Sequence, residues 1–353
     1  MKGKNILTAG AWAALILGLS GCAGRAPSVC ELPSPRRGIP QPMQGDEIYA
    51  AGIPFHIGAR VVRWDEPNGY NGYLERPFFS NSRGQGSGRP WPRRTYGSRF
   101  SKGELGGARP DLEALQGVVD QFVFHYDAVG TSRGCFRVLH DERQLSVHFL
   151  LDLDGTIYQT LDLKEAAWHA TISNRRSIGI EIANVGAYPP GKLERLREWY
   201  ARDSRGRTWI RVPDRLQPTG FLRPGFRPRP ARSEPVEGVV QGARLIQYDF
   251  TPEQYQALIR LTAALCRIFP KIRCDCPRDA QGRLIAHALT RDQWRRHQGL
   301  LGHYHIQKNK VDPGPAFQWE TVIEGARRAM ESGAPGQIAL RRGRSDAAAH
   351  ESL

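Results

Sequence analysis

The sequence predicts an α/β (α+β) fold in which a central mixed β-sheet is flanked by helices and interrupted by loop-rich insertions. Two β-rich runs, 145–152 and 156–161, meet at the dipeptide Asp154-Gly155, which is typical of a tight hairpin turn. The segment 252–269 has apolar residues at helical spacing. With 40% hydrophobic and 24% charged residues, the chain can bury a core. Collagen-like, coiled-coil and wholly disordered classes are therefore excluded.

Three further segments are predicted to supply strands. The run 121–126 is apolar, and the run 177–183 is apolar at alternate positions around Glu181. Residues 48–64 are expected to form one or two short strands that end at a turn-rich segment. Together with the hairpin, these strands would form the centre of the fold.

The helix over 252–269 has the clearest start signals. The sequence TPEQ at 251–254 predicts an N-cap, a proline at the first helical position and a reciprocal capping contact. A second long helix is expected at about 317–330, and a short one at 111–120. Each would cover the sheet with its apolar face.

Arg-rich and Pro-rich segments interrupt this pattern. Residues 81–109 are expected to be an irregular surface segment. Residues 187–246 are interpreted as a solvated insertion loop, with a rim that grips anionic polymer as the alternative. A second insertion is expected at about 274–300, and the charged tail over 333–353 is predicted to be disordered.

The N-terminus indicates export. Two lysines precede an uncharged run, which is typical of an export signal. The run includes LSGC at 19–22, which resembles the bacterial lipobox; an ordinary cleavage site that carries a cysteine is the alternative. We therefore expect a signal peptide over 1–21, lipidation at Cys22 and a Pro-rich tether over 22–47. Ala23, in place of the aspartate that retains lipoproteins in the inner membrane, favours the periplasmic side of the outer membrane.

Export changes the interpretation of charge. The formal net charge is +15, which in a cytosolic protein would suggest nucleic acid as a partner. Outside the cytoplasm the available polyanions are anionic lipid and cell-wall polymer. We therefore expect no nucleic-acid partner, and we expect membrane association through the lipid anchor.

Several polar residues occupy positions that favour metal chemistry. His125 ends an apolar strand, and Glu181 projects from another, where burial is costly unless a metal or a cation compensates it. His303 follows a glycine and precedes Lys310 and Asp312. Two histidines and one carboxylate, with a fourth position for water, form a standard catalytic zinc set.

Four stretches of the chain resemble the zinc-dependent type-2 N-acetylmuramoyl-L-alanine amidases, relatives of the peptidoglycan recognition proteins. The stretches are FVFHYDAVG (122–130), SVHFLLDLDGTIYQTLDLKEAAWHA (146–170), RSIGIEIAN (176–184) and GHYHIQKNKVDPGPAF (302–317). From the first to the last, they span residues 122–317, about half of the chain, in the order found in that family. The resemblance implies a catalytic domain over 111–332 that follows a strand-and-loop extension over 48–110.

The resemblance also implies roles for individual residues. Zn²⁺ would be held by His125, His303 and Asp312. Glu181 would be the acid/base, and Lys310 would help to stabilise the oxyanion. The implied reaction is hydrolysis of the amide between the lactyl group of N-acetylmuramic acid and L-alanine, in peptidoglycan or in muropeptides.

Three positions leave alternatives open. His305 lies two residues after His303 and could replace it as a ligand. Val147 stands where some relatives carry a catalytic tyrosine, which puts the acid/base role on Glu181. His169 is implied to face the substrate, and a hydrogen-bonded structural histidine is the alternative.

Two further functions are compatible with the sequence. Ser132 lies in a G-x-S-x-G motif at 130–134, which would suit a serine esterase, but the doubly wound α/β pattern around it is missing. A peptidoglycan-binding lipoprotein without catalysis is the second possibility.

A group of cysteines near the second insertion stays open as well. Cys266, Cys274 and Cys276, with His287, could form a structural metal site. In an oxidising compartment, a disulfide from Cys266 to Cys274 or Cys276 is an equal alternative.

Overall fold

The computed structural model describes residues 45–79 and 94–332. The predicted signal peptide, the lipidation site at Cys22, nearly all of the tether and the tail over 333–353 lie outside the described residues. None of the helices in the described part is long and apolar enough to cross a membrane.

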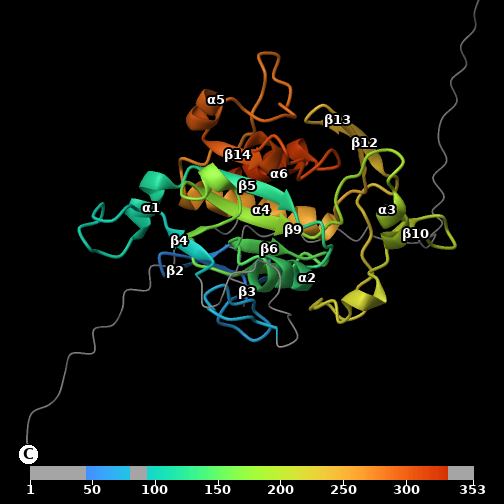
Figure 1. Cartoon of the computed structure of the whole chain (residues 1–353), viewed down its shortest axis with the longest axis horizontal. Helices are drawn as coiled ribbons and strands as arrows, with labels where there is room; N and C mark the ends of the chain where they lie inside the picture. Colours follow the sequence, from blue (N-terminus) through green and yellow to red (C-terminus); the bar gives the residue numbers. More distant parts are fainter. Residues whose placement is uncertain (1–44, 80–93, 333–353) are drawn as a thin grey trace, which may run out of the picture. The chain divides into compact units, whose positions relative to one another are not determined.

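A six-stranded sheet organises the described residues (Figure 1). In spatial order its strands are β14 (Gly299–Gly302), β5 (Gln121–Tyr126), β9 (Ser177–Ile182), β6 (Phe149–Leu151), β7 (Ile157–Gln159) and β3 (Val61–Arg63). The first four are parallel, β7 runs antiparallel to β6, and β3 is parallel to β7. The predicted mixed sheet is confirmed.

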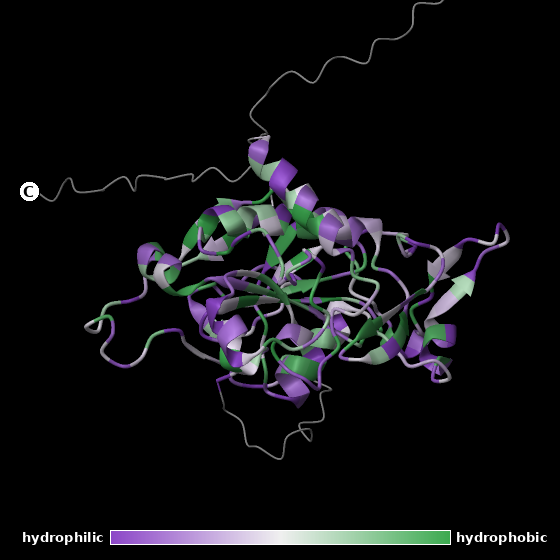
Figure 2. Cartoon of the chain, turned by 90° about the horizontal axis from the view of Figure 1, so that it is seen from above, coloured by the Kyte–Doolittle hydropathy of each residue, from purple (hydrophilic) through white to green (hydrophobic). Residues whose placement is uncertain are grey.

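The two faces of the sheet pack against different helices because side chains alternate along a strand. Phe122 and Phe124 of β5 belong to the main core, with residues of α4 (Pro252–Ile268) and α6 (Trp319–Glu331). On the other face, Leu150 of β6 packs with α2 (Ser132–Phe136). Helices therefore flank the sheet on both sides (Figure 1). Figure 2 shows largely hydrophobic strands between helices with mixed surfaces.

The predicted helices are confirmed with small shifts at their ends. Helix α4 begins with the full capping box, in which the Thr251 hydroxyl accepts from the backbone N–H of Gln254 and the Gln254 side chain accepts from that of Thr251. Helix α6 starts two residues later than expected. The short predicted helix is α1 (Leu112–Val118), capped by the side chain of Asp111.

The predicted hairpin is confirmed, but its strands are short. β6 and β7 pair antiparallel over three residues each, and Gly155 takes a φ of +83° in the turn. The N-terminal region forms three strands rather than one or two, since β1 (Glu47–Ala50) and β2 (Ile53–His56) pair with each other and β3 joins the main sheet.

The prediction of a surface segment over 81–109 is wrong for part of its described residues. β4 (Tyr96–Ser98) pairs with β8 (Glu165–Ala167), and Arg99 beside it is buried. The Arg99 guanidinium donates to the carbonyl oxygens of Leu163 and Ser177, so its burial is compensated by hydrogen bonds.

The prediction of a solvated loop over 187–246 is also wrong. The segment contains α3 (Glu194–Trp199), β10 (Tyr200–Arg202), β11 (Thr208–Ile210), β12 (Val236–Val240) and β13 (Ala243–Gln247). Trp199 and Ile210 pack in an apolar cluster with Leu153 of the hairpin region. Ion pairs join Arg229 to Asp203 and Arg215 to Glu198. Both arginines are therefore paired with carboxylates from other parts of the segment, and the local sequence around each arginine did not predict these ion pairs.

The remaining helical elements are short. They are a π-helix over Arg137–Glu142, α5 (Arg291–Arg296) and single 3₁₀ turns at Thr171–Ser173, Asp214–Leu216 and His303–His305.

Candidate active site

The carboxyl ends of three neighbouring strands bring the predicted residues together. β14, β5 and β9 are adjacent and parallel, and His125 is in register with Glu181. Gly302, the last residue of β14, is in register with Phe124, so His303 follows next to His125. Because parallel strands end at one edge of the sheet, these three side chains lie in a row across the sheet.

His125, His303 and Asp312 form a compact cluster. The Nδ1 atoms of the two histidines lie 3.0 Å apart, and Asp312 Oδ2 lies 2.9 Å from the first and 3.0 Å from the second. One donor atom from each residue lies within 4.8 Å of the others, and all three residues are buried. Two imidazole nitrogens and a carboxylate oxygen fit a divalent ion such as zinc. The chain therefore has a His-His-Asp group that could bind a metal.

Each histidine of the cluster has a partner for its outer nitrogen. His125 Nε2 lies 2.9 Å from Nδ1 of His169, and His303 Nε2 lies 2.6 Å from Oε1 of Gln307. Histidines that bind metals usually donate their second N–H to such an acceptor. The arrangement leaves both Nδ1 atoms directed at Asp312.

The protonation states in the cluster suit a cation. Burial, and then the charge of His303, lower the pKa of His125 to about 4, so this imidazole is neutral near pH 7. Burial alone would raise the pKa of Asp312, but the charge of His303 and the hydrogen bonds from both histidines hold it well below its ordinary value. A metal needs deprotonated ligands, and these two residues supply them.

The loop that carries Asp312 is fixed by Gln247 at the end of β13. Its side-chain amide donates to the carbonyl oxygen of Pro313 at 3.1 Å and accepts from the backbone N–H of Ala316 at 3.0 Å. Gly314 lies between them with a φ of +86°, and a Cβ there would lie 2.2 Å from Gln247 Oε1. Only glycine fits this position.

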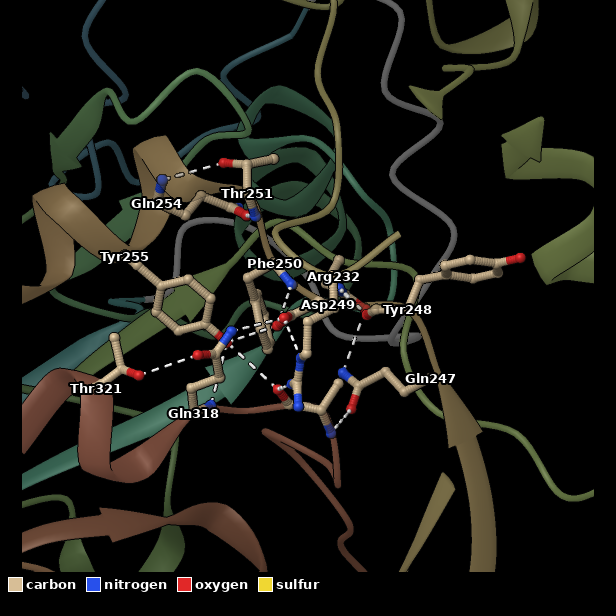
Figure 3. Close-up of polar contacts among 12 residues, drawn as sticks. Arg232, Gln247, Tyr248, Asp249, Phe250, Thr251, Gln254, Tyr255, Gln318 and Thr321 are labelled. Atoms are coloured by element: carbon tan, nitrogen blue, oxygen red, sulfur yellow. Dashed lines mark hydrogen bonds and ion pairs between the residues drawn. The ribbon is translucent and has the colours of Figure 1, made fainter. Parts of the chain in front are cut away.

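A polar network beside Gln247 extends this support (Figure 3). The buried Asp249 accepts hydrogen bonds from the Tyr255 hydroxyl and the Gln318 side chain, at 2.7 Å each, and forms an ion pair with Arg232 at 2.6 Å. Arg232 also donates to the carbonyl oxygen of Ala316. The network joins the start of α4 to the segment that follows Asp312.

Glu181 and Lys310 line a cavity of about 290 Å³ next to the cluster. Burial, and then the negative charge of Asp312, raise the pKa of Glu181 well above its ordinary value, while the charge of Lys310 acts to lower it. Trp168 and Arg143 line the same cavity. The cavity therefore combines a perturbed carboxyl group with cations and an aromatic wall.

A larger hollow of about 560 Å³ lies elsewhere, lined by Arg60, Arg223 and Arg260 among others. Among the described residues that line it there is no histidine or cysteine, and its Glu253 forms an ion pair with Arg223. Size alone therefore does not make it the reactive site.

His305 lies outside the cluster. Its Nδ1 accepts from the backbone N–H of Gly302 at 2.8 Å, and its Nε2 lies 2.6 Å from the carbonyl oxygen of Ile285. With both nitrogens engaged, His305 supports the turn that presents His303. The alternative in which it replaces His303 as a ligand is not favoured.

Ser132, the candidate nucleophile of a serine esterase, lies in a different environment from the metal cluster. It is buried and its hydroxyl has no hydrogen-bond partner among the described residues, so no base is arranged to activate it. Val147 packs in the apolar cluster with Leu150. Cys266, Cys274 and Cys276 are free thiols in this structure.

Sequence reasoning missed three residues around the site. The side-chain oxygen of Gln307 lies within hydrogen-bond distance of His303 Nε2. Asp127 lines the cavity, and its carboxylate accepts hydrogen bonds from the backbone N–H groups of Val129 and Gly130. Arg143 lies at the cavity wall. The four-residue spacing from His303 to Gln307 was the one available signal, since such residues share a helical face.

Residues 115–214 match the family model described as N-acetylmuramoyl-L-alanine amidase. The matched range includes His125, His169 and Glu181, whereas His303 and Asp312 lie beyond it. No curated protein sequence matches the chain.

Several solved structures are similar to this chain at low identity. AmiD of E. coli, an N-acetylmuramyl-L-alanine amidase in complex with an anhydro-N-acetylmuramic acid tripeptide, is 18% identical over 66% of each chain, with a TM-score of 0.32. The endolysin amidase LysCS of Clostridium intestinale is 15% identical over 60% of this chain and 86% of its own, with a TM-score of 0.32. AmpD is 18% identical over 71% of this chain and 98% of its own, with a TM-score of 0.27. Likeness at this level does not establish a shared activity.

Proposed function

Because residues 115–214 match the family model described as N-acetylmuramoyl-L-alanine amidase, we propose that the chain is a zinc-dependent hydrolase of peptidoglycan or muropeptides. It would cleave the amide between the lactyl group of N-acetylmuramic acid and L-alanine. The observation that carries this proposal is the buried His125, His303 and Asp312 cluster at the edge of a cavity that also contains Glu181.

Zn²⁺ held by the three residues would supply Lewis-acid activation of water and of the scissile carbonyl. Glu181 lies in register with His125 and lines the same cavity, so it is placed to accept a proton from the attacking water. It would then deliver this proton to the leaving amine of L-alanine. A buried carboxyl group whose pKa is raised above its ordinary value is a stronger base than an exposed carboxylate, which suits the transfer of a proton in both steps.

Lys310 would stabilise the negative charge that develops on the carbonyl oxygen. Its side chain lines the cavity, and its positive charge acts to lower the pKa of both Glu181 and His125. An ammonium aimed at a developing oxyanion in a water-poor site lowers the barrier more than it would in water. His169, in the wall of the cavity, is proposed to face the substrate. The exposed Arg143 in the same wall would attract the carboxylates of a stem peptide.

The proposal extends to location. The LSGC sequence ahead of a Pro-rich segment supports a lipid anchor at Cys22 and a tether to the amidase domain. We place the protein on the periplasmic side of the outer membrane, where the anchor would keep it beside the cell wall. Labelling with a radioactive fatty acid, lost in Cys22→Ser, tests this part.

The experiment for the activity is to incubate the full chain with purified peptidoglycan and to analyse the products by mass spectrometry. We expect free stem peptides beginning with L-alanine, no release after chelation, and recovery on addition of zinc. His303→Ala should abolish release, while Ser132→Ala should leave at least half of it. Cleavage between sugars, or full activity in His303→Ala, would contradict the proposal. Tight binding of peptidoglycan without cleavage would favour the non-catalytic lipoprotein.

A further inference from the structure

His169 makes contacts that a substrate-facing role does not require. Its Nδ1 lies 2.9 Å from Nε2 of His125, and its Nε2 lies 3.1 Å from the hydroxyl of Ser177. The His125 and His169 rings are nearly perpendicular, at 85°, with centroids 5.2 Å apart. A hydrogen-bonded row therefore runs from Asp312 through His125 and His169 to Ser177.

We propose that His169 is a positioning residue that stabilises His125 in the form that can bind the metal, with the proton on Nε2 and the lone pair on Nδ1 facing Asp312. This inference rests on the proposed function, because it assigns a task within the proposed zinc site.

The reason lies in where the single proton of a neutral imidazole can reside. In the form competent for metal, His125 donates its Nε2–H to His169, and His169 donates its own Nε2–H to Ser177. In the other form, His125 donates Nδ1–H to Asp312 at 2.9 Å and closes the cluster on itself. The Ser177 hydroxyl can accept or donate, so the row accommodates either form.

Without an acceptor at position 169, the two forms would no longer be balanced. The Nε2–H of His125 would be buried and unpaired, which is unfavourable. The proton would then favour Nδ1, where it is paired with Asp312 and blocks the lone pair. The metal would have to overcome this penalty on binding.

His169 is itself held firmly. The side chain of Asn174 accepts from the backbone N–H groups of His169 and Ala170, at 3.2 and 2.7 Å. The ring lies directly over Gly179 of β9, where an added Cβ would lie 2.5 Å from both Cε1 and Nδ1 of His169. A glycine in the middle of a central strand weakens the strand, and here its absence of a side chain makes room for the imidazole.

The test is the zinc affinity of the full chain, measured in detergent by competition with a chromogenic chelator. His169→Leu removes the nitrogen that accepts from His125 Nε2–H. Gly179→Ala retains His169 but displaces its ring from its place over the strand. Both should weaken zinc binding about 10–100-fold, the range expected for a lost partner of a metal-binding histidine. His169→Asn places an amide oxygen near the position of Nδ1 and should stay within about threefold of wild type. Gly117→Ala is the matched control, since a Cβ there meets nothing within 4 Å.

Each outcome decides the inference. Wild-type zinc affinity in His169→Leu or Gly179→Ala overturns it, and so does an equal loss in His169→Asn and His169→Leu. A change in KM for muropeptide with unchanged zinc affinity would assign His169 to the substrate alone. If either variant fails to fold, as judged by its thermal melting curve, the other decides.

The two proposals can fail separately. A wild-type chain that binds zinc but leaves the amide intact removes the proposed activity, while the affinity series still tests His169. A wild-type chain that hydrolyses the amide, with His169→Leu binding zinc normally, removes the positioning role and leaves the activity. A wild-type chain that binds no zinc overturns both.

Discussion

Two buried carboxylates, Asp249 and Asp312, lie at opposite ends of one supporting network and differ in what faces them. Asp249 is 0% exposed and is paired with the guanidinium of Arg232, with further hydrogen bonds from Tyr255 and Gln318. Asp312 is 8% exposed, and its ion-pair partners within the described residues are the imidazoles of His125 and His303 alone.

The difference distinguishes a structural charge from a functional one. A buried charge is costly unless a cation or strong hydrogen bonds compensate it. At Asp249 the protein supplies that cation as the guanidinium of Arg232. Beside Asp312 it places the Nδ1 atoms of His125 and His303, which lie within about 3 Å of the same carboxylate oxygen. The second arrangement suits an external cation, which the two imidazole nitrogens and the carboxylate oxygen could bind together. This is why we assign the chemistry to Asp312.

The largest expected effect is on activity in Asp312→Asn. Loss of one anionic ligand should reduce amide hydrolysis on the order of a thousandfold, which corresponds to several kcal/mol of metal-assisted stabilisation. The metal-free variant should lose less than about 2 kcal/mol of unfolding free energy, because the substituted amide can still accept a hydrogen bond from an imidazole in place of Asp312. Urea denaturation in the presence of a chelator measures the stability. A metal-free variant that is less stable by more than about 2 kcal/mol would show that Asp312 is a structural charge like Asp249.

The matching change at the other end of the network is Asp249→Asn. It should lower the free energy of unfolding by about 3 kcal/mol, the lower end of the range for a broken buried pair, since Arg232 is partly exposed and can be hydrated. Zinc affinity should fall less than tenfold, because the ligands themselves remain. Urea denaturation and chelator competition measure the two quantities. A destabilisation below about 0.5 kcal/mol would remove the contrast between the two carboxylates.

A pH series sharpens the comparison, because some buried histidines have no carboxylate partner. Burial, and then the charge of Arg99, lower the pKa of His148 to about 3. Between pH 6.5 and 3 the unfolded chain therefore binds more protons at this residue than the folded chain, and stability is lost as the pH falls. Between pH 6.5 and 5, the contribution of His148 amounts to about 2 kcal/mol.

The measurement is the difference in unfolding free energy between wild type and His148→Gln at several pH values, with a chelator present. Taking the difference removes other titrating groups, including Asp127, whose pKa is raised to about 7 by burial and which acts in the opposite sense. Parallel curves for the two proteins over pH 5–6.5 would show that His148 does not titrate as its surroundings require.

The contrast between the two carboxylates also shows what the sequence could predict. His125 and Glu181 were found because strands alternate, so a polar residue in an apolar run identifies a position of interest. His303 and Asp312 were placed by resemblance to a family, since no local pattern joins them to β5. The partners of Asp249 could not be found in this way, because Arg232 and Gln318 lie 17 and 69 residues away in the sequence and no local pattern joins them to Asp249.

The same limit explains the errors outside the site. Local composition predicted an irregular surface segment over 81–109, which includes Arg99, and a solvated insertion loop over 187–246. In the structure, the guanidinium of Arg99 donates to the carbonyl oxygens of residues 163, 175 and 177. In the insertion, Arg215 forms an ion pair with Glu198, and Arg232 forms one with Asp249. The local sequence therefore shows where the arginines are, but it does not predict which distant groups they bind.

The smallest expected effect lies between the two carboxylates, at Gln247. Gln247→Ala removes the contacts with Pro313 and Ala316 and leaves both backbone groups without these partners. We expect a loss of about 1 kcal/mol in unfolding free energy. Zinc affinity should fall a few-fold, since Asp312 would occupy its position for a smaller fraction of the time. Gln247→Leu is the matched comparison, because it removes the same two hydrogen bonds and retains most of the side-chain volume at this buried position. If zinc affinity is unchanged in both variants, the loop holds Asp312 without Gln247, and the network around Asp249 stabilises the fold without contributing to the metal site.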